Sequence, residues 1–337
     1  MLLFRWTLQD VSIYSLSSQE LTNGEFGWEI FLMVALQNVT NVPRIQTEYM
    51  RERIQKMKKR MGDFFRGNTR QLIQICFLVA ACILPWILDF NRLFDSWYTN
   101  TDASPDNWLW HLALSYGNPA ISYGNPAISI LLVGLAWAAV RKWDSEYVMN
   151  KNSAYHDYSY VWYWFCAKIL GIKKCNLILV PISTQFKLVI RGTFPDYPLD
   201  LNDYPSISEE NACLIAVSNV DAGTDEVNLV IEDTYEILDS QIPEEKRSLQ
   251  TIRVSRCDGT NNRHFSQKLI DAVNGTVRQK GSIPRLNVFA TTNPMNSKQI
   301  AMNAFVQGGR GNVAHLYVFQ QESKGNRVFS KRGRKIY

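Results

Sequence analysis

Three polar stretches of the sequence carry hydroxyl, amide and guanidinium groups that are suited to bind an anion. They are Ser183-Thr184-Gln185, Ser255 to Arg263 (SRCDGTNNR) and Thr291 to Asn296 (TTNPMN). The third leads into a predicted helix N-terminus, where backbone N–H groups and nearby hydroxyls favour phosphate, and arginine adds charge for it. These residue types predict a site for an anionic, nucleotide-like ligand, with ordinary loop capping as the alternative interpretation. The candidate ligand-binding residues are Ser183, Thr184, Gln185, Arg256, Asp258, Thr260, Asn261, Arg263, Thr291, Thr292, Asn293 and Arg310.

Known catalytic motifs are absent from the sequence. No G-x-G-x-x-G follows a predicted strand, and no G-x-x-x-x-G-K-[ST] or G-x-S-x-G occurs. The four histidines are not in H-E-x-x-H or H-x-x-x-H spacing, and Glu232-Asp233 has the pattern of a solvated turn. The six cysteines form no C-x-x-C pair, which indicates neither a disulfide framework nor a zinc site. We therefore expect a protein that is not an enzyme and has no catalytic residue, metal or cofactor.

The polar stretches lie at the ends of predicted strands. Short apolar runs predict strands, and apolar residues with a period near 3.6 predict helices. The predicted strands are 176–182, 213–217, 227–231, 249–254, 286–290 and 313–319, and the predicted helices are 264–279 and 297–306. Residues 188–211 are largely polar and are predicted to be irregular. The β-α-β-α-β order at the end implies a parallel, Rossmann-like sheet, which binds ligands beyond the carboxyl ends of its strands.

Two uncharged apolar stretches precede this domain. Leu72 to Leu88 (LIQICFLVAACILPWIL) has one polar side chain, and Ala127 to Val140 (AISILLVGLAWAAV) has no charge. A membrane-spanning helix needs about 20 mostly apolar residues, and flanking uncharged residues extend the stretches to 71–88 and 123–140. They predict a transmembrane hairpin over 71–142, with a pair of buried core helices as the alternative. The residues suited to helix–helix contact within the membrane are Gln74, Ser129 and Gly134.

Charge placement predicts the orientation of this hairpin. Residues 89–126 carry four acids and one base, whereas residues 141–174 carry six bases and three acids. Cytoplasmic loops carry the excess of Lys and Arg. The sequence therefore predicts that both termini lie in the cytoplasm and that the connecting loop lies outside.

Four further segments flank the hairpin and the domain. Residues 44–70 combine nine Lys or Arg and three acids with a helical apolar period, which indicates a membrane-surface or interaction helix; the alternative is a solvated face. The aromatic residues 143–173 predict either a linker along the lipid headgroups or a helix packed on the domain. The tail 323–337, with six bases and no acid between Lys324 and Lys335, is predicted to be disordered. Residues 1–43 show no clear pattern.

A resemblance to a known family rests on the stretch from Phe265 to Phe319. The motifs FSQKLIDAVNGTV, LNVFA, TTNPMNSKQIAMNAF and VAHLYVFQ resemble the C-terminal half of SAVED domains, the sensors of bacterial CBASS antiphage systems. SAVED domains resemble two fused CARF-like Rossmann units and bind cyclic oligonucleotides, and some members carry two transmembrane helices ahead of the sensor. The resemblance extends over residues 175–320 of a domain at 174–322. That length is short for two complete CARF-like units.

The resemblance implies a membrane-anchored α/β protein, in which a two-helix transmembrane hairpin precedes a Rossmann-like (CARF/SAVED-like) cytoplasmic domain. It implies an effector of the bacterial inner (plasma) membrane whose partners are a cyclic oligonucleotide, the lipid bilayer and further copies of itself, and not a DNA or RNA duplex. Ligand binding would drive oligomerisation and membrane disruption, which causes abortive infection. The alternatives are a membrane-tethered nucleotide hydrolase and a non-enzymatic scaffold that recruits a protein partner.

Overall fold

The computed structural model describes most of the chain after residue 43. The described residues are 44–89, 124–151, 154–199, 201–206, 212–222, 225–256, 263–307, 312–322 and 326–337. They belong to two compact units, Met1–Gly62 and Asp63–Tyr337. The predictions for residues 1–43 and for most of the loop between the two apolar stretches lie outside the described residues.

One long helix, α2 (Arg44–Gly67), contains all that is described of the first unit. It agrees with the helix predicted for residues 44–70. Its last residue is followed by Asn68 alone before the next helix begins. The basic helix is therefore joined almost directly to the first apolar helix.

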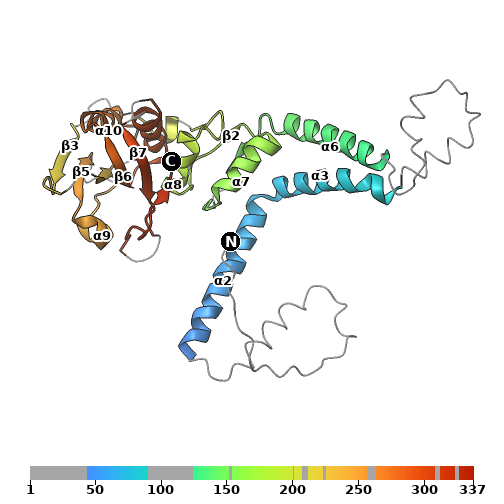
Figure 1. Cartoon of the computed structure of the whole chain (residues 1–337), viewed down its shortest axis with the longest axis horizontal. Coiled ribbons are helices and arrows are strands. Elements are labelled where there is room, and N and C mark those ends of the chain that lie inside the picture. The colour runs from blue at the N-terminus through green and yellow to red at the C-terminus, as the bar shows by residue number, and fades with distance from the viewer. Residues whose placement is uncertain are drawn as a thin grey trace, which may run out of the picture. The chain divides into compact units, whose positions relative to one another are not determined.

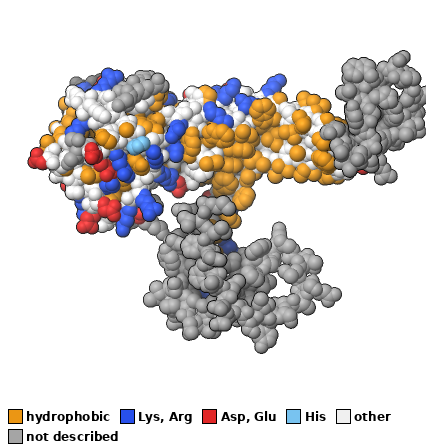
Figure 2. All heavy atoms as spheres, viewed as in Figure 1, with side chains coloured by type: hydrophobic (Ala, Val, Ile, Leu, Met, Phe, Trp, Pro, Cys, Tyr) orange, Lys and Arg blue, Asp and Glu red, His pale blue; other side chains and the backbone are white. Residues whose placement is uncertain are grey.

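Helices α3 (Thr69–Ile87) and α6 (Gly124–Trp143) form the predicted hairpin. They lie side by side (Figure 1), and the Ser129 hydroxyl donates a 2.9 Å hydrogen bond to the Cys82 carbonyl oxygen. Each contains a stretch of 19 residues that is long and apolar enough to cross a membrane. Only 17% of each stretch is buried, and Figure 2 shows an extended apolar surface over this region. This exposure favours membrane spans over the alternative of two buried core helices.

The aromatic stretch after α6 folds into the domain. Its elements are β1 (Val148–Met149), α7 (Tyr160–Phe165), the π-helix η2 (Cys166–Leu170) and β2 (Lys174–Cys175), which pairs in parallel with β1. The Ser159 hydroxyl caps α7 by accepting a hydrogen bond from the Trp162 N–H. Tyr163, Cys166 and Leu170 are wholly buried. Of the two interpretations given for residues 143–173, a helix packed on the domain therefore describes α7 and η2.

The domain is built on a six-stranded mixed sheet with the order β3-β5-β4-β6-β7-β8. The strands are β3 (Leu214–Ser218), β4 (Glu226–Glu232), β5 (Gln250–Ser255), β6 (Ile283–Ala290), β7 (Val313–Phe319) and β8 (Arg334–Lys335). The four central strands, β5, β4, β6 and β7, pair in parallel. The β-α-β-α-β order of the sequence predicts this direction for β5, β6 and β7. The edge strands β3 and β8 are antiparallel to their neighbours, which makes the sheet mixed.

Helices pack on this sheet around one main hydrophobic cluster. They are α8 (Ile182–Ile190), α10 (Gln267–Gln279) and α11 (Pro294–Ile300), which continues as the π-helix η5 (Ala301–Gln307). Short elements lie between them: η3 (Leu201–Asp203), η4 (Asp239–Gln241) and α9 (Glu244–Arg247). The Ser266 hydroxyl caps α10 by accepting a 3.0 Å hydrogen bond from the Leu269 N–H. The apolar side of α10 then buries Leu269, Ile270 and Val273, as its 3.6-residue period predicts.

The strand predicted for residues 176–182 is wrong. Strand β2 ends at Cys175, just before this segment. The chain then turns after Leu177, with Leu179 in the left-handed region at φ 58°. The Gln185 amide stabilises this turn by donating to the carbonyl oxygens of Leu177 and Val180 at 3.1 and 2.8 Å. A short apolar run fits a buried turn and helix as well as a strand. Helix α8 consequently also extends into the segment predicted to be irregular from Leu188.

The prediction of a disordered basic tail is also wrong for residues 326–337. Strand β8 pairs with β7, and Phe329 and Ile336 are 2% and 0% exposed. Burial of these two apolar side chains outweighs the solvation of the neighbouring bases. The Arg191 guanidinium also donates to the Ile336 carbonyl oxygen at 2.8 and 3.1 Å.

Candidate functional site

The carboxyl ends of the four parallel strands meet at one edge of the sheet, hereafter the carboxyl edge. The residues that follow these strands are Asp233 to Glu236 after β4, Arg256 after β5, Thr291 to Asn293 after β6, and Gln320-Gln321 after β7. Strands β5 and β6 lie on the two sides of β4, so the direction of winding reverses between β4 and β6. Open α/β sheets bind their ligands at such a reversal.

Asp233 lies at this reversal with a fully buried side chain. Its Oδ1 accepts hydrogen bonds from Arg256 Nε, at 2.8 Å, and from Arg256 Nη2. Its Oδ2 accepts from the Asn293 N–H, from Asn293 Nδ2 and from Asn296 Nδ2, at 3.0, 3.1 and 3.0 Å. The prediction of a solvated turn here is therefore wrong for Asp233. Its carboxylate balances the Arg256 charge inside the protein and lies beside the N-terminus of α11, which favours an anion.

Arg256, a candidate ligand-binding residue, belongs to the same buried network. Its side chain is 4% exposed. Besides its bonds to the Asp233 carboxylate, Nη2 donates to the Asp233 carbonyl oxygen at 3.1 Å, and Nη1 lies 3.1 Å from His264 Nδ1. A charge can be buried only when it is paired in this way. Arg256 thus holds the segments after β4 and β5 together and does not present its charge to solvent.

The candidates after β6 are buried as well. The Thr291 hydroxyl donates to the Tyr235 carbonyl oxygen at 2.9 Å, and the hydroxyls of Thr292 and Ser297 lie 2.7 Å apart. Asn293 caps α11, because its Oδ1 accepts from the Asn296 N–H at 2.9 Å. Among the described residues, the hydrogen bonds of these side chains therefore cap a helix and its loop, which is the alternative to an anion site that the sequence left open.

The candidates Ser183, Thr184 and Gln185 form the first turn of α8. The Ser183 N–H donates to Gln320 Oε1 at 3.4 Å, and Thr184 Oγ1 accepts from Arg334 Nη1 at 3.2 Å. The turn therefore lies beside the end of β7. The structure brings this group to the same edge of the sheet as Arg256 and the residues after β6.

An outer group of side chains at the carboxyl edge consists of the candidate Arg263 and of Tyr235, Gln321 and Arg327, which no sequence motif indicates. The Tyr235 hydroxyl donates to Gln321 Oε1 at 2.5 Å, and the Arg327 guanidinium lies 4.6 Å from the centre of the Tyr235 ring. Burial raises the pKa of the Tyr235 hydroxyl, against the opposing effect of Arg327 and Arg263. Arg263 and Arg327 are exposed. An aromatic ring with two cations nearby is suited to a nucleotide, through stacking and phosphate contact.

Arg263 is the one described candidate that offers an exposed charge at this edge. The candidates that lie outside the described residues are Asp258, Thr260, Asn261 and Arg310. The signal that could have identified Tyr235 is its position, since it closely follows a central strand. Among the described residues, no cluster of three or more His, Cys, Asp or Glu side chains is arranged to hold a metal.

A second polar cluster joins the two ends of the hairpin. The Asp144 side chain, fully buried, pairs with Arg70 at 3.0 Å and accepts from Gln74 Nε2 at 2.8 Å. Arg70 Nη2 also donates to the Trp143 carbonyl oxygen at 3.1 Å. Asp144 Oδ2 and the Oε1 atoms of Gln71 and Gln74 are buried without a hydrogen-bond partner among the described residues. The cluster ties the start of α3 to the end of α6.

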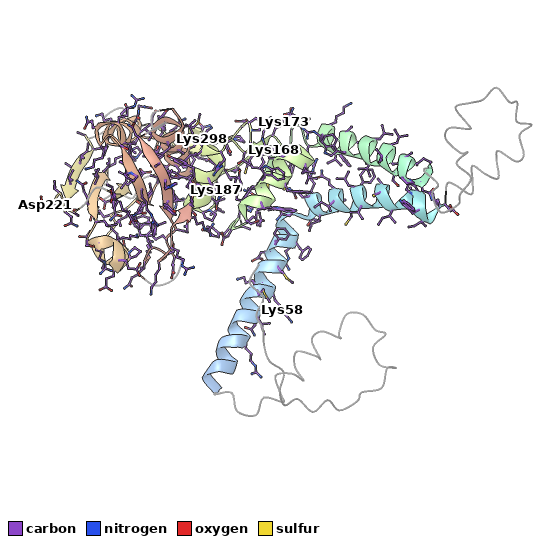
Figure 3. The ribbon with its side chains drawn as sticks, in the orientation of Figure 1. Lys58, Lys168, Lys173, Lys187, Asp221 and Lys298 are labelled. Atoms are coloured by element: carbon purple, nitrogen blue, oxygen red, sulfur yellow. The ribbon has the colours of Figure 1, made fainter. Side chains whose placement is uncertain are left out.

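The segment of α7 and η2 contacts both hairpin helices. Trp162 Nε1 donates to Asn68 Oδ1 at 2.9 Å, beside α3, and Trp137 Nε1 of α6 donates to the Ile169 carbonyl oxygen at 2.7 Å. Arg141 Nη1 donates to the Lys168 carbonyl oxygen at 3.0 Å. Figure 3 shows Lys168 and Lys173 near this junction. The domain is therefore held to the hairpin by hydrogen bonds on both of its helices.

Comparison with known proteins identifies the family. Residues 53–337 match the family described as the SMODS- and ubiquitin system-associated 2TM effector domain. The chain belongs to this family. The match confirms the two-transmembrane effector recognised from the sequence. No curated protein matches the chain.

Structural comparison of this 2TM effector finds two structures of the Acinetobacter baumannii Cap4 SAVED/CARF-domain containing receptor, one with the cyclic trinucleotide 3'3'3'-cAAA and one with 2'3'3'-cAAA. Identities are 10% and 8%, and the TM-score is 0.35 for both. The matches cover 48% and 51% of this chain but only 38% and 40% of the receptor chains.

Proposed function

We propose that this 2TM effector binds a cyclic oligonucleotide at the carboxyl edge of its sheet and responds by oligomerising and disrupting the bacterial inner membrane. It would then act as a CBASS-type antiphage effector that causes abortive infection. The observation that carries this proposal is the family match over residues 53–337 together with two exposed apolar helices joined to an α/β domain.

The proposed orientation places both termini in the cytoplasm. Basic residues lie at both ends of the hairpin that face away from its connecting loop: Arg66 and Arg70 on the two sides of the α2–α3 junction, and Arg141 and Lys142 in the last turn of α6. An excess of Lys and Arg favours the cytoplasmic side. The ligand site then faces the compartment in which a nucleotide second messenger is made.

The carboxyl edge supports a binding role. Its inner layer, centred on Asp233 and Arg256, is paired and buried, so it provides a rigid floor. Its outer layer presents the Tyr235 ring and the exposed Arg263 and Arg327. We propose that a base stacks on Tyr235 in place of Arg327, and that the two arginines then bind phosphate oxygens.

The proposed output is assembly. A ligand that joins two sensor domains raises the local concentration of their hairpins, and effective concentration alone can convert weak helix contacts into a stable assembly. We propose that no bond of the ligand is broken. The alternatives, a nucleotide hydrolase or a scaffold for a protein partner, predict different outcomes of the same experiment.

The test uses the full chain in lipid nanodiscs with a panel of cyclic di- and trinucleotides. A rise in melting temperature with one ligand, recovery of that ligand intact, and ligand-dependent dye leakage from liposomes are expected. Recovery of a cleaved ligand would favour the hydrolase, and the lack of any shift would favour the scaffold. Leakage that does not depend on ligand would refute the proposed control of the hairpin.

Two matched variants locate the site. Arg263→Ala removes an exposed cation at the carboxyl edge, and we expect about a tenfold or greater loss of ligand affinity, since a hydrogen bond to a charged group contributes about 1.5–3 kcal/mol. Arg278→Ala removes an exposed cation from the last turn of α10 and should leave affinity unchanged. Equal affinities for the two variants would place the site elsewhere.

A further inference from the structure

Helix α2 carries an exposed apolar stripe next to exposed bases. Met57, Met61 and Phe65 are 59%, 54% and 53% exposed. Residues four apart lie on one face of a helix, so the three side chains form a continuous stripe. Arg51, Lys59 and Arg66 are exposed outside that stripe on the same helix. Figure 3 marks the helix at Lys58. This is the composition of helices that lie in a membrane interface.

The chain itself determines that a bilayer lies within reach of this stripe. Only Asn68 separates α2 from α3, and α3 is a candidate membrane span. At a rise of about 1.5 Å per residue, Met57 lies only about 18 Å along the helix from the start of α3. The stripe is therefore tethered next to the lipid headgroups, whereas a protein partner would have to be recruited from solution.

The last turn of α2 is anchored at the same boundary. The Phe64 ring packs edge-on against Tyr158 and Trp162, with ring centres 5.5 and 5.1 Å apart. Trp162 in turn donates its indole hydrogen bond to Asn68 at the start of α3. Tryptophan and tyrosine are enriched at the level of the headgroups. These contacts hold the end of α2 at the boundary that α3 enters.

We propose that α2 is an interfacial helix that binds anionic phospholipid, with Met57, Met61 and Phe65 in the acyl boundary and its bases on the headgroup phosphates. The family and the ligand proposal assign no lipid to this helix. Each base near an anionic surface contributes about 1 kcal/mol. Neutralising two of them should therefore lower the ratio of membrane-bound to free helix about thirty-fold.

The experiment is hydrogen–deuterium exchange of the full chain without nucleotide, in nanodiscs that hold one copy each. The discs contain phosphatidylcholine alone or phosphatidylcholine with phosphatidylglycerol. Amides of α2 should exchange more slowly in the anionic discs, and high salt should remove the difference because it screens exposed charges. Exchange of β4 and β6 peptides in the same samples reports whether the domain is folded.

Three variants complete the test. Lys59→Gln with Arg66→Gln should abolish the slower exchange, whereas the charge-conserving pair Lys59→Arg with Arg66→Lys should retain it. Met61→Ser removes an apolar side chain from the stripe and should therefore speed the exchange of α2 amides in both kinds of disc. Equal exchange of α2 amides in neutral and anionic discs overturns the proposal. Protection of these amides only in discs that hold two copies would also overturn it, because the stripe would then bind a second chain. Since no nucleotide is present, these results are independent of the proposed sensing function.

Discussion

Replacing Asp233 with asparagine tests whether the buried network organises the carboxyl edge. The carboxylate accepts hydrogen bonds on both oxygens, from Arg256 on one and from Asn293 and Asn296 on the other. An asparagine has one acceptor oxygen, and its amide nitrogen would face donors in either orientation. Asp233→Asn therefore leaves either the buried arginine or the loop after β6 without an acceptor, although its shape is conserved.

The expected cost follows from burial. The side chains of Asp233 and Arg256 are 0% and 4% exposed, and breaking a buried ion pair from one side costs about 3–5 kcal/mol. A domain is stable by only about 5–15 kcal/mol, so the variant should lose a large part of its stability. Asp239→Asn is the matched control, because this carboxylate pairs with Arg253 but is 82% exposed, and exposed pairs contribute about 1 kcal/mol or less.

The assay must report on the domain rather than on the hairpin. All ten tryptophans lie before residue 165, so tryptophan fluorescence does not observe the sheet. Urea unfolding of the full chain in nanodiscs, followed by hydrogen–deuterium exchange of β4 and β6 peptides, gives the required free energy. If Asp233→Asn loses no more stability than Asp239→Asn, the Asp233 carboxylate does not organise the carboxyl edge.

Three further predictions concern the packing of the domain. Tyr197→Phe should lose about 1–3 kcal/mol in the same unfolding assay, because the buried hydroxyl donates to a backbone carbonyl oxygen at 2.6 Å; an unchanged midpoint would show that the bond contributes little. Burial raises the pKa of the Cys175 thiol, so iodoacetamide near pH 8 should label the partly exposed Cys213 and leave Cys175 unmodified, as peptide mass spectrometry can check. Truncation before residue 326 removes Phe329 and Ile336, both at most 2% exposed, and should cost about 3 kcal/mol or more. A truncated chain as stable as the full one would show that packing of the tail on the sheet contributes nothing to stability.

The sequence predicts the parallel strands well because their signal is local. The segments 227–231, 249–254, 286–290 and 313–319 correspond to β4, β5, β6 and β7, and these strands pair in parallel. The position of β4 between β5 and β6 was not predicted. The strand prediction for residues 176–182 fails because this segment forms a turn that leads into α8, and the Gln185 side chain stabilises the turn by donating to the Leu177 and Val180 carbonyl oxygens. Side-chain hydrogen bonds to the backbone compete with strand formation in this way.

The candidate site shows the same limit. The strand pattern indicates which segments follow the strands but not the direction in which their side chains point. Arg256 is a candidate ligand-binding residue by its position, but its side chain is buried against Asp233, which directly follows β4. Conversely, Tyr235 was overlooked, because its place beside Arg327 joins segments that are far apart in the sequence. Side-chain contacts between such distant segments depend on the order of the strands in the sheet, and no single stretch of the sequence determines that order.

The position of α7 and η2 explains how an event at the carboxyl edge could act on the hairpin. Arg334 links Thr184 of α8 to Asp157 just before α7, at 3.2 and 3.3 Å. Trp162 and Ile169 then bond to residues beside α3 and within α6. This segment buries Tyr163, Cys166 and Leu170 completely, and close-packed contacts of this kind transmit displacement rather than absorbing it. A shift of α8 against β7 would therefore act on both hairpin helices together, which is the motion required if clustering of the hairpins is the output of the protein.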